Sequence, residues 1–276
     1  ASSSMDMAGE EADMVMPTAR CGHSMVVVPQ DPFKLLTFGG SCLESGRYIS
    51  DVWQLSAGAY PSWDEIPQGG DIPFARLHAT SCVMGNKVFL YGGEAESYEL
   101  LGDIHAFDID RRRWLDMRTI YPYPPGRQLH AAAALPDETM WVVGGIGDKP
   151  LTDVWVFDAQ SLVWREVRMR GKGPFDGPNG GKVSLSAHTL STVQGKLVLI
   201  GGRKGHALST SNWIIDTVSE QWVEILPSPD QPPGPVLPSR WKHCSAGSTS
   251  GDCVYVSGGL GTRDRFADMW KMELLV

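Results

Sequence analysis

Two series of residues that can do chemistry recur along the sequence, about one member per fifty residues. The first is a histidine, usually preceded closely by an arginine, at His23, His78, His130, His188 and His243. The second is an acid or amide shortly before an aromatic residue, at Asp51, Asp103, Asp153, Asn212 and Asp268. Metal ligands must lie about 2.0–2.3 Å from one ion, and side chains on separate repeats rarely converge so closely. We therefore expect both series to make structural hydrogen bonds.

The composition excludes several classes of protein. The chain has 276 residues and a net charge of −8, which argues against nucleic-acid binding through bulk charge. No apolar run approaches the roughly 18 residues of a membrane span, so we expect no membrane partner. The five cysteines lack paired spacing, which argues against a structural zinc site. An odd number of cysteines favours free thiols in a reducing compartment, so we expect the protein to be located in the cytoplasm or the nucleus.

The elements that carry these residues follow from an internal repeat. Gly-Gly pairs end five short apolar runs, with spacings of 53, 52, 57 and 57 residues, at 39–40, 92–93, 144–145, 201–202 and 258–259. Each copy contains segment a after the histidine, segment b before Gly-Gly, segment c after the acid, and segment d around a second tryptophan. All four have strand length and are rich in β-branched and aromatic residues. Four antiparallel strands per fifty residues predict one blade of a β-propeller.

The residues resemble the kelch repeat over positions 17–276. Gly-Gly after an apolar run, followed by aromatic residues at regular spacing, is the pattern of that family. The second copy departs from it with His105 after the acid, and the fourth lacks both the arginine and the acid. The resemblance implies an all-β, kelch-type β-propeller, in which we detect five four-stranded blades. Residues 39–53 also look like the first blade of plant F-box/kelch proteins.

The fifth copy lacks segment d, so an additional strand is needed to complete its sheet. We expect residues 1–16 to form a separate N-terminal segment, part of which (5–16) pairs beside 268–275 and closes a five-bladed ring. The alternative is a sixth blade in a longer chain. We also expect the Gly-rich linker 171–183 to be mobile and the Pro-rich linker 227–238 to be a stiff spacer.

Function in a repeat fold is best sought where the copies differ. The b–c loops and the d–a linkers lie on one face and carry irregular charges, acidic near blade 2 and basic near blades 4 and 5. We expect this face to bind a partner protein or peptide with acidic groups, gripped by arginines. The alternative is a solvated charged rim. The predicted binding residues are Arg47, Tyr48, Glu94, Glu96, Glu99, Arg203, Lys204, His206, Arg263 and Arg265.

The resemblance favours a non-catalytic interaction module, such as the substrate-recognition part of a ubiquitin-ligase adaptor. We expect no catalytic residues, cofactor, metal or small-molecule substrate. One alternative is a kelch-fold enzyme such as an iron-dependent, specifier-type lyase. Glu99 and Asp103 match the first two positions of the specifier iron motif, but Phe107 stands where a cysteine is needed. A structural subunit of a large assembly is the other alternative.

Overall fold

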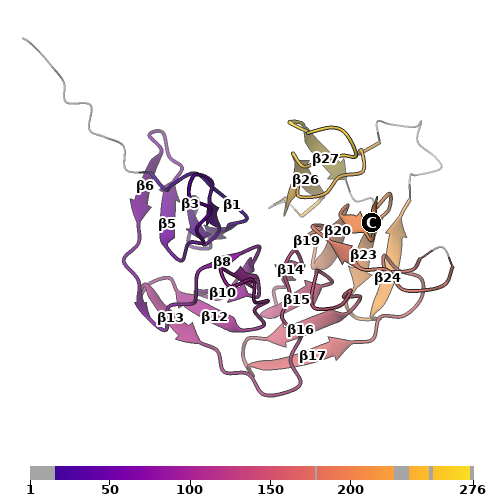
Figure 1. Ribbon diagram of the computed structural model, residues 1–276, viewed down its shortest axis with the longest axis horizontal. Helices are drawn as coiled ribbons and strands as arrows, with labels where there is room; N and C mark the ends of the chain where they lie inside the picture. Colours follow the sequence, from indigo (N-terminus) through magenta and orange to yellow (C-terminus); the bar gives the residue numbers. More distant parts are fainter. Residues whose placement is uncertain (1–15, 178, 227–235, 249–250, 274–276) are drawn as a thin grey trace, which may run out of the picture.

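The computed structural model describes residues 16–177, 179–226, 236–248 and 251–273, and these residues form five successive antiparallel sheets. Figure 1 shows the sheets following one another around a central axis, with β14 and β19 on the inner side of theirs. This arrangement confirms the prediction of an all-β propeller. No helix in the described residues is long and apolar enough to cross a membrane.

The first four sheets each contain four main strands in the order of the sequence. Blade 1 contains β2 (Ser24–Val28), β3 (Asp31–Phe38), β5 (Val52–Ser56) and β6 (Ser62–Glu65). Blade 2 contains β9 (Thr80–Met84), β10 (Lys87–Tyr91), β12 (Ile104–Asp108) and β13 (Arg113–Asp116), joined by the short β7 (Gly69–Gly70). Blade 3 contains β14 (Ala131–Ala134), β15 (Thr139–Val143), β16 (Val154–Asp158) and β17 (Val163–Val167). Blade 4 contains β19 (Thr189–Val193), β20 (Lys196–Ile200), β23 (Asn212–Asp216) and β24 (Gln221–Ile225).

The fifth sheet has three strands within the described residues: β25 (Cys244–Gly247), β26 (Cys253–Ser257) and β27 (Met269–Glu273). The predicted closing segment, residues 5–16, lies almost wholly outside the described residues, so ring closure by the N-terminus stays a prediction. Residues 227–235 of the Pro-rich linker also lie outside them.

Short strands join each b–c loop to the linker that leads into the same blade, so both lie on one face, which we call the loop face. The pairs are β1 (Arg20–Cys21) with β4 (Ser41–Cys42), β8 (Arg76–Leu77) with β11 (Glu94–Ala95), and β18 (Leu185–Ser186) with β21 (Arg203–Lys204), which also pairs with β22 (Ala207–Leu208). Isolated bridges do the same in blade 3 (Gln128 to Ile146) and blade 5 (Trp241 to Leu260). The predicted placement of both loop sets on one face is therefore observed.

The core lies between neighbouring blades rather than within any one sheet. A four-stranded sheet cannot bury both faces alone, so Phe38 of blade 1 packs edge-on against Trp114 of blade 2. Tyr91 of blade 2 packs against Trp164 of blade 3 with the rings tilted, their centroids 5.0 Å apart. Trp114 and Trp164 are fully buried. The repeated tryptophans are thus structural, as their periodicity indicates.

The Gly-Gly pairs bring the backbones of neighbouring blades together. The N–H of Gly93 donates to the carbonyl of Arg127 in the next blade at 2.8 Å. Gly92 has a φ of +67°, and a Cβ there would lie 2.9 Å from the same carbonyl oxygen. Only glycine fits both the left-handed backbone and this close approach.

The Gly-rich linker between blades 3 and 4 is anchored in its described part, contrary to the expectation of mobility. Phe175 is buried and packs edge-on against Trp222, with ring centroids 6.0 Å apart. Asp176 accepts a hydrogen bond from Lys182 and one from the backbone N–H of Gly173. An aromatic residue in a glycine-rich stretch is the signal that could have predicted this anchor.

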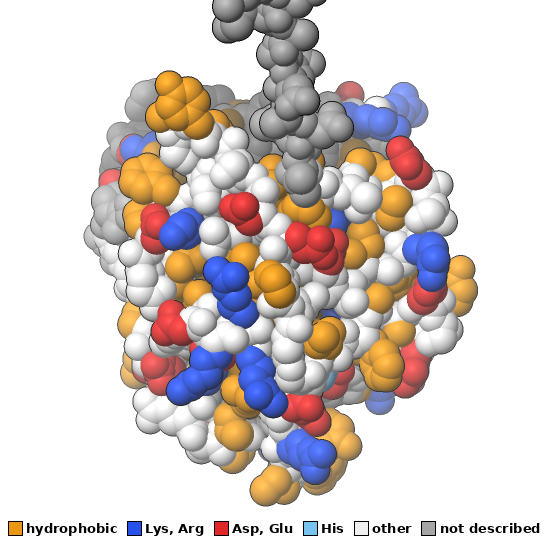
Figure 2. Space-filling model, turned by 90° about the vertical axis from the view of Figure 1, so that its left-hand side faces the viewer, with side chains coloured by type: hydrophobic (Ala, Val, Ile, Leu, Met, Phe, Trp, Pro, Cys, Tyr) orange, Lys and Arg blue, Asp and Glu red, His pale blue; other side chains and the backbone are white. Residues whose placement is uncertain are grey.

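The outer flank of the propeller has mixed charge. Figure 2 shows Lys and Arg side chains interspersed with Asp, Glu and apolar side chains on the flank that includes β5, β6 and β13. A flank with both signs of charge is typical of a solvated outer surface. The irregular charges and the short strand pairs, in contrast, lie on the loop face.

Candidate functional site

The periodic arginine and aspartate form an ion pair beneath the loop face in four of the five blades. In blade 3, Arg127 donates to both carboxylate oxygens of Asp153, at 2.8 and 2.7 Å. Its remaining donors reach the carbonyls of Gly144 and Pro125 at 2.9 and 3.2 Å. Trp155 Nε1 donates to the same carboxylate at 2.8 Å. Burial alone would raise the pKa of Asp153, but the hydrogen bonds and charge of Arg127 lower it.

The same arrangement recurs in three other blades, where the pairs are Arg20–Asp51, Arg76–Asp103 and Arg240–Asp268. In blade 2, His105 Nε2 replaces the tryptophan N–H on Asp103. The structural interpretation of the aspartates is therefore confirmed, although their partner is an arginine. Asp103, which matches a specifier-type iron motif, is fully engaged by Arg76 and His105. The described residues contain no group of three histidine, cysteine, aspartate or glutamate side chains that could hold a metal ion.

Four of the five periodic histidines occupy the same position, beside the second glycine of their own blade, and His78 does not. His130 bonds Thr80 of the preceding blade at 2.7 Å, and His243 bonds Thr189 at 2.9 Å. His78 follows its arginine by two residues rather than three and has a φ of +57°, so Ala79 takes the equivalent position. The prediction that all five share one position is therefore wrong for His78. The shorter spacing after Arg76 is the signal in the sequence.

His78 belongs to a series of five residues with left-handed backbone, one before the first strand of each blade, which we call the axial collar. Three neighbouring pairs are joined by backbone hydrogen bonds, from His78 to Gly22 (2.9 Å), from Ala187 to Leu129 (2.8 Å) and from Lys242 to Ala187 (3.0 Å). Their φ values lie between 51° and 64°, a conformation that costs about 1–3 kcal/mol for a non-glycine residue and is frequent at functional sites. The collar consists of Gly22, His78, Leu129, Ala187 and Lys242.

Beside the collar, blades 1 to 3 contribute a polar network. Tyr48 Oη donates to Glu94 at 2.7 Å, and Gln128 Nε2 donates to the other carboxylate oxygen at 2.5 Å. The ring of His78 contacts Gln128 Oε1 at 2.9 Å. Burial and the bond to Glu94 raise the pKa of Tyr48 to about 12, so it remains a neutral donor at neutral pH. Glu94 therefore already has partners, unlike the exposed Glu96 and Glu99 of the same loop.

Blades 4 and 5 contribute a basic cluster of Arg203, Trp241 and Lys242. The Arg203 guanidinium carbon lies 4.9 Å from the Trp241 ring centroid, and Lys242 Nζ lies 5.1 Å from it. Within the described residues, no carboxylate lies at ion-pair distance from either cation. Lys242 and His78 are both members of the axial collar. Burial lowers the pKa of His78, the hydrogen bond to Gln128 opposes this effect, and the charge of Lys242 adds to it. The basic cluster and the polar network therefore flank the same collar.

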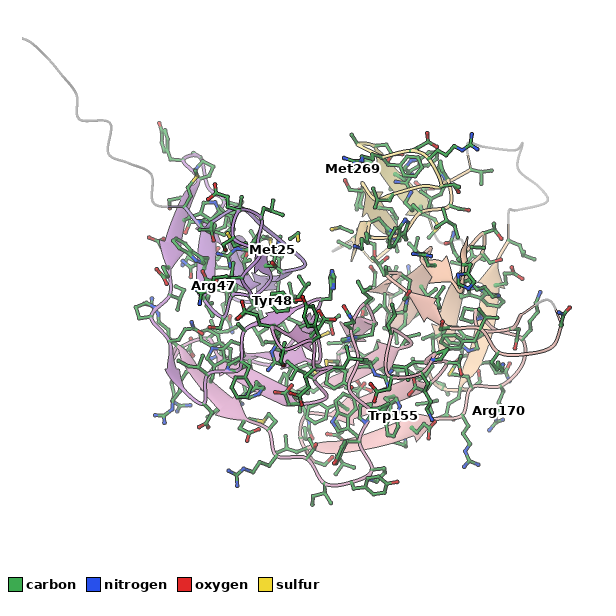
Figure 3. The ribbon with its side chains drawn as sticks, in the orientation of Figure 1. Met25, Arg47, Tyr48, Trp155, Arg170 and Met269 are labelled. Atoms are coloured by element: carbon green, nitrogen blue, oxygen red, sulfur yellow. The ribbon has the colours of Figure 1, made fainter. Side chains whose placement is uncertain are left out.

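The other predicted residues occupy the surrounding loops. Figure 3 shows Arg47 and Tyr48 on one loop of blade 1. Glu96 and Glu99 line a pocket of about 500 Å³ over buried Leu101. Arg263 and Arg265 are exposed on the loop that begins at Leu260, which bridges to Trp241. Lys204 follows Arg203 in β21 and pairs with β22, and His206 is exposed in the turn between these two strands. Sequence reasoning found Arg203 but missed Trp241 and Lys242, which lie between the periodic Arg240 and His243, before segment a, rather than in a b–c loop.

Sheets packed face to face around an axis, with the loop face free, define a β-propeller built from kelch-type blades. Comparison with known protein families also identifies kelch repeats in this chain. The family described as the KLHDC2/KLHL20/DRC7 Kelch-repeats domain matches residues 3–181, and the Kelch motif matches residues 184–225. The chain belongs to the kelch-repeat family.

Several curated proteins are similar to most of the chain. An F-box/kelch-repeat protein of Arabidopsis thaliana is 28% identical over 96% of the chain and 57% of its own length. Kelch domain-containing protein 3 of Bos taurus is 25% identical over 92% of the chain and 68% of its own length. Adagio-like protein 1 of Oryza sativa is 28% identical over 83% of the chain and 35% of its own length. The chain thus spans little more than half of the Arabidopsis protein and about two thirds of the bovine one.

Proposed function

We propose that the chain is a non-catalytic protein-interaction module whose loop face binds an acidic segment of a partner protein. The observation that supports this most strongly is the basic cluster, where Arg203 and Lys242 contact one indole beside the axial collar. A guanidinium held against an aromatic ring keeps its hydrogen-bond donors free for carboxylates. Two cations without carboxylate partners among the described residues favour an acidic ligand.

The polar network would set the register of the bound segment. Tyr48 and Gln128 already donate to Glu94, so this side of the collar offers a fixed carboxylate and amide rather than free positive charge. A partner with carboxylates toward blades 4 and 5 and hydrogen-bond donors toward blades 1 to 3 would match both sides. Electrostatic complementarity of this kind determines orientation and partner choice more than raw affinity.

We further propose that the bound partner is a substrate presented to a ubiquitin ligase, in the cytoplasm or the nucleus. Support comes from the similarity of nearly the whole chain to an F-box/kelch-repeat protein. The five cysteines are free thiols, which suits a reducing compartment. Mass spectrometry of proteins that co-purify with the full-length natural protein tests this role, because ligase subunits should accompany the substrate. Recovery of the substrate with the full-length protein but without any ligase subunit would contradict it.

Charge reversal tests the binding face. A triple variant with Arg203→Glu, Arg263→Glu and Arg265→Glu should bind acidic peptides at least about 30-fold more weakly, since each lost contact with a desolvated charge costs 2 kcal/mol or more. The probe is a synthetic peptide array that varies in Asp and Glu content, followed by titration of the best peptide. The melting temperature should stay within about 2 °C, because these residues are at least partly exposed.

A matched control is Arg112→Glu, which reverses an exposed arginine at a turn between segments c and d on the opposite face. Its binding should equal that of the unmodified chain. Unchanged binding by the triple variant, or equal loss in the Arg112 variant, would contradict binding through the basic cluster.

A further inference from the structure

We propose that blade 2 carries a second docking surface, which binds an arginine side chain of a partner protein. It surrounds the pocket of about 500 Å³ on the loop face, which we call the blade 2 pocket. The pocket is lined by Phe74 and Ala75 from the linker and by residues 95–97 and 99–103 from the b–c loop. This surface is separate from the basic cluster, so the proposal does not depend on an acidic segment binding there.

The blade 2 pocket has a fixed shape. The N–H of Ala95 donates to the carbonyl of Glu99 at 2.9 Å, and the N–H of Leu101 donates to the carbonyl of Gly93 at 2.8 Å. The b–c loop is tied to the linker by the pairing of β11 with β8. Ala95 and Leu101 are buried and form an apolar floor. A preformed apolar pocket with a few polar groups around it is typical of a binding site.

Two carboxylates of the pocket have no cation beside them. Glu96 and Glu99 are exposed, and in the described part of the chain no lysine, arginine or histidine lies at ion-pair distance from either. Asp103 also lines the pocket, but its carboxylate is engaged by Arg76 and His105. The charge that the pocket offers is therefore negative and complementary to a cationic ligand.

The ring of Phe74 lines the pocket without serving the fold. The carbonyl of Phe74 accepts a hydrogen bond from Arg76 Nε at 3.0 Å, and the carbonyls of Thr18, Pro125 and Pro238 accept the same bond in other blades. The fold thus requires a carbonyl at this position but not an aromatic ring. Because the ring is 77% exposed, its face is accessible to a cation that the neighbouring carboxylates attract.

Tyr98, at the tip of the same b–c loop, is held in a backbone conformation that favours glycine. Its φ is +64°, and its N–H donates to the carbonyl of Ala95 at 2.8 Å. In blade 1 the equivalent bond, to the carbonyl of Cys42, is made by Gly46 with a φ of +70°. Packing does not explain a tyrosine here, since the side chain is 79% exposed. Strained residues of this kind are frequent at binding sites.

Arginine is the side chain that matches all of these features. Its planar guanidinium can lie against an aromatic ring while it donates to carboxylates, whereas the compact ammonium of lysine does not match this geometry. Its aliphatic stem covers apolar surface such as the floor at Leu101. We therefore assign the blade 2 pocket to an arginine within a neutral or basic segment of a partner protein.

Peptide binding to the 276-residue chain tests the proposal. The probes are nine-residue peptides with a central arginine in varied neutral flanks, and the best binder is then compared with its citrulline and lysine counterparts. Citrulline keeps the shape of arginine without its charge, so its peptide should bind at least about 30-fold more weakly, and the lysine peptide about 5-fold more weakly. Failure of every arginine peptide to bind, or equal binding of the citrulline peptide, would overturn the proposal.

A double variant locates the binding. Glu96→Gln with Glu99→Gln should weaken the arginine peptide at least about 30-fold and leave the acidic peptide unaffected. The matched control, Asp64→Asn with Glu65→Gln, removes two exposed carboxylates from the outer strand β6 of blade 1 and should change neither affinity. The triple arginine variant of the loop face should bind the arginine peptide at least as tightly as the unmodified chain. Weaker binding by that variant would place the arginine peptide at the basic cluster and overturn the proposal.

Tyr98→Gly separates binding from stability. Glycine relieves the left-handed strain, so the melting temperature should rise by about 2 °C, while the arginine peptide should bind at least about 5-fold more weakly. A lower melting temperature with unchanged binding would contradict a role of Tyr98 in the docking surface. The double variant also tests two other occupants. Stabilisation by calcium alone, or concentration-dependent dimerisation, that is lost in the double variant would assign the pocket to a metal or to a second copy and overturn the proposal.

Discussion

Replacing Arg127 with leucine is expected to lower the free energy of unfolding by about 3–5 kcal/mol, the usual cost of removing one partner of a buried ion pair. The Arg127 side chain is completely buried, and all its hydrogen-bonding groups have partners in Asp153, Gly144 and Pro125. Its loss would remove the arginine donors of two carbonyls and of the buried Asp153 carboxylate, which would keep the hydrogen bond from Trp155 Nε1. Urea unfolding followed by tryptophan fluorescence measures the change.

The chain itself offers the control for this substitution. Blade 4 has Leu185 and Ser211 in place of the arginine and the aspartate, and Ser211 Oγ donates a hydrogen bond to Glu224. The double variant Arg127→Leu, Asp153→Ser should therefore be more stable than Arg127→Leu alone by about 2 kcal/mol. Strictly additive effects of the two substitutions would contradict a coupled pair.

Acidification is expected to destabilise the propeller between pH 7 and pH 5, with about 4 kcal/mol from His188 and His243 together and a further loss from buried His130, whose pKa burial also lowers. Burial lowers the pKa of His188 to about 3 and that of His243 to about 4. The unfolded chain binds protons at these sites below about pH 6.5 whereas the folded chain does not, so stability is lost as the pH falls. Each site contributes about 1.4 kcal/mol per pH unit below pH 6.5, until the pH reaches its folded pKa.

Histidine variants identify the source of this pH dependence. His188→Leu places an apolar side chain that cannot titrate at this buried position. Between pH 6 and pH 5, the variant should take up about one proton fewer on unfolding, which lowers the slope of the unfolding free energy against pH. His206→Gln, at an exposed histidine, should leave the slope unchanged. An unchanged slope in the His188 variant would show that His188 is not a neutral buried group.

Much of the fold could be predicted because the determining signals are local and repeated. Gly-Gly after an apolar run marks the loop-face end of the second strand of each sheet, and the spacing of Trp114 and Trp164 marks the contacts between sheets. The Arg127–Asp153 pair was harder to predict, because its members are distant in sequence and meet only when the sheet forms. The fourth copy contained the clue, since its arginine and aspartate are replaced together.

The candidate site was only partly predictable, because it is assembled from different blades. Arg203 stands out as a charge in a b–c loop, but Trp241 looks like a residue of the repeat. The contact between them requires knowledge of which loop lies beside which strand around the axis. His78 looked like a repeat histidine, and only its shorter distance from Arg76 indicates that it belongs to the axial collar.

The central claim is that a partner binds the loop face at the basic cluster, and hydrogen exchange with the best acidic peptide bound tests it most directly. We predict slower exchange at Arg203, Lys204, Trp241 and Lys242, with no change at the opposite turns 84–87 and 194–196. Protection confined to those turns, with unchanged exchange at the basic cluster, would contradict the proposed binding face.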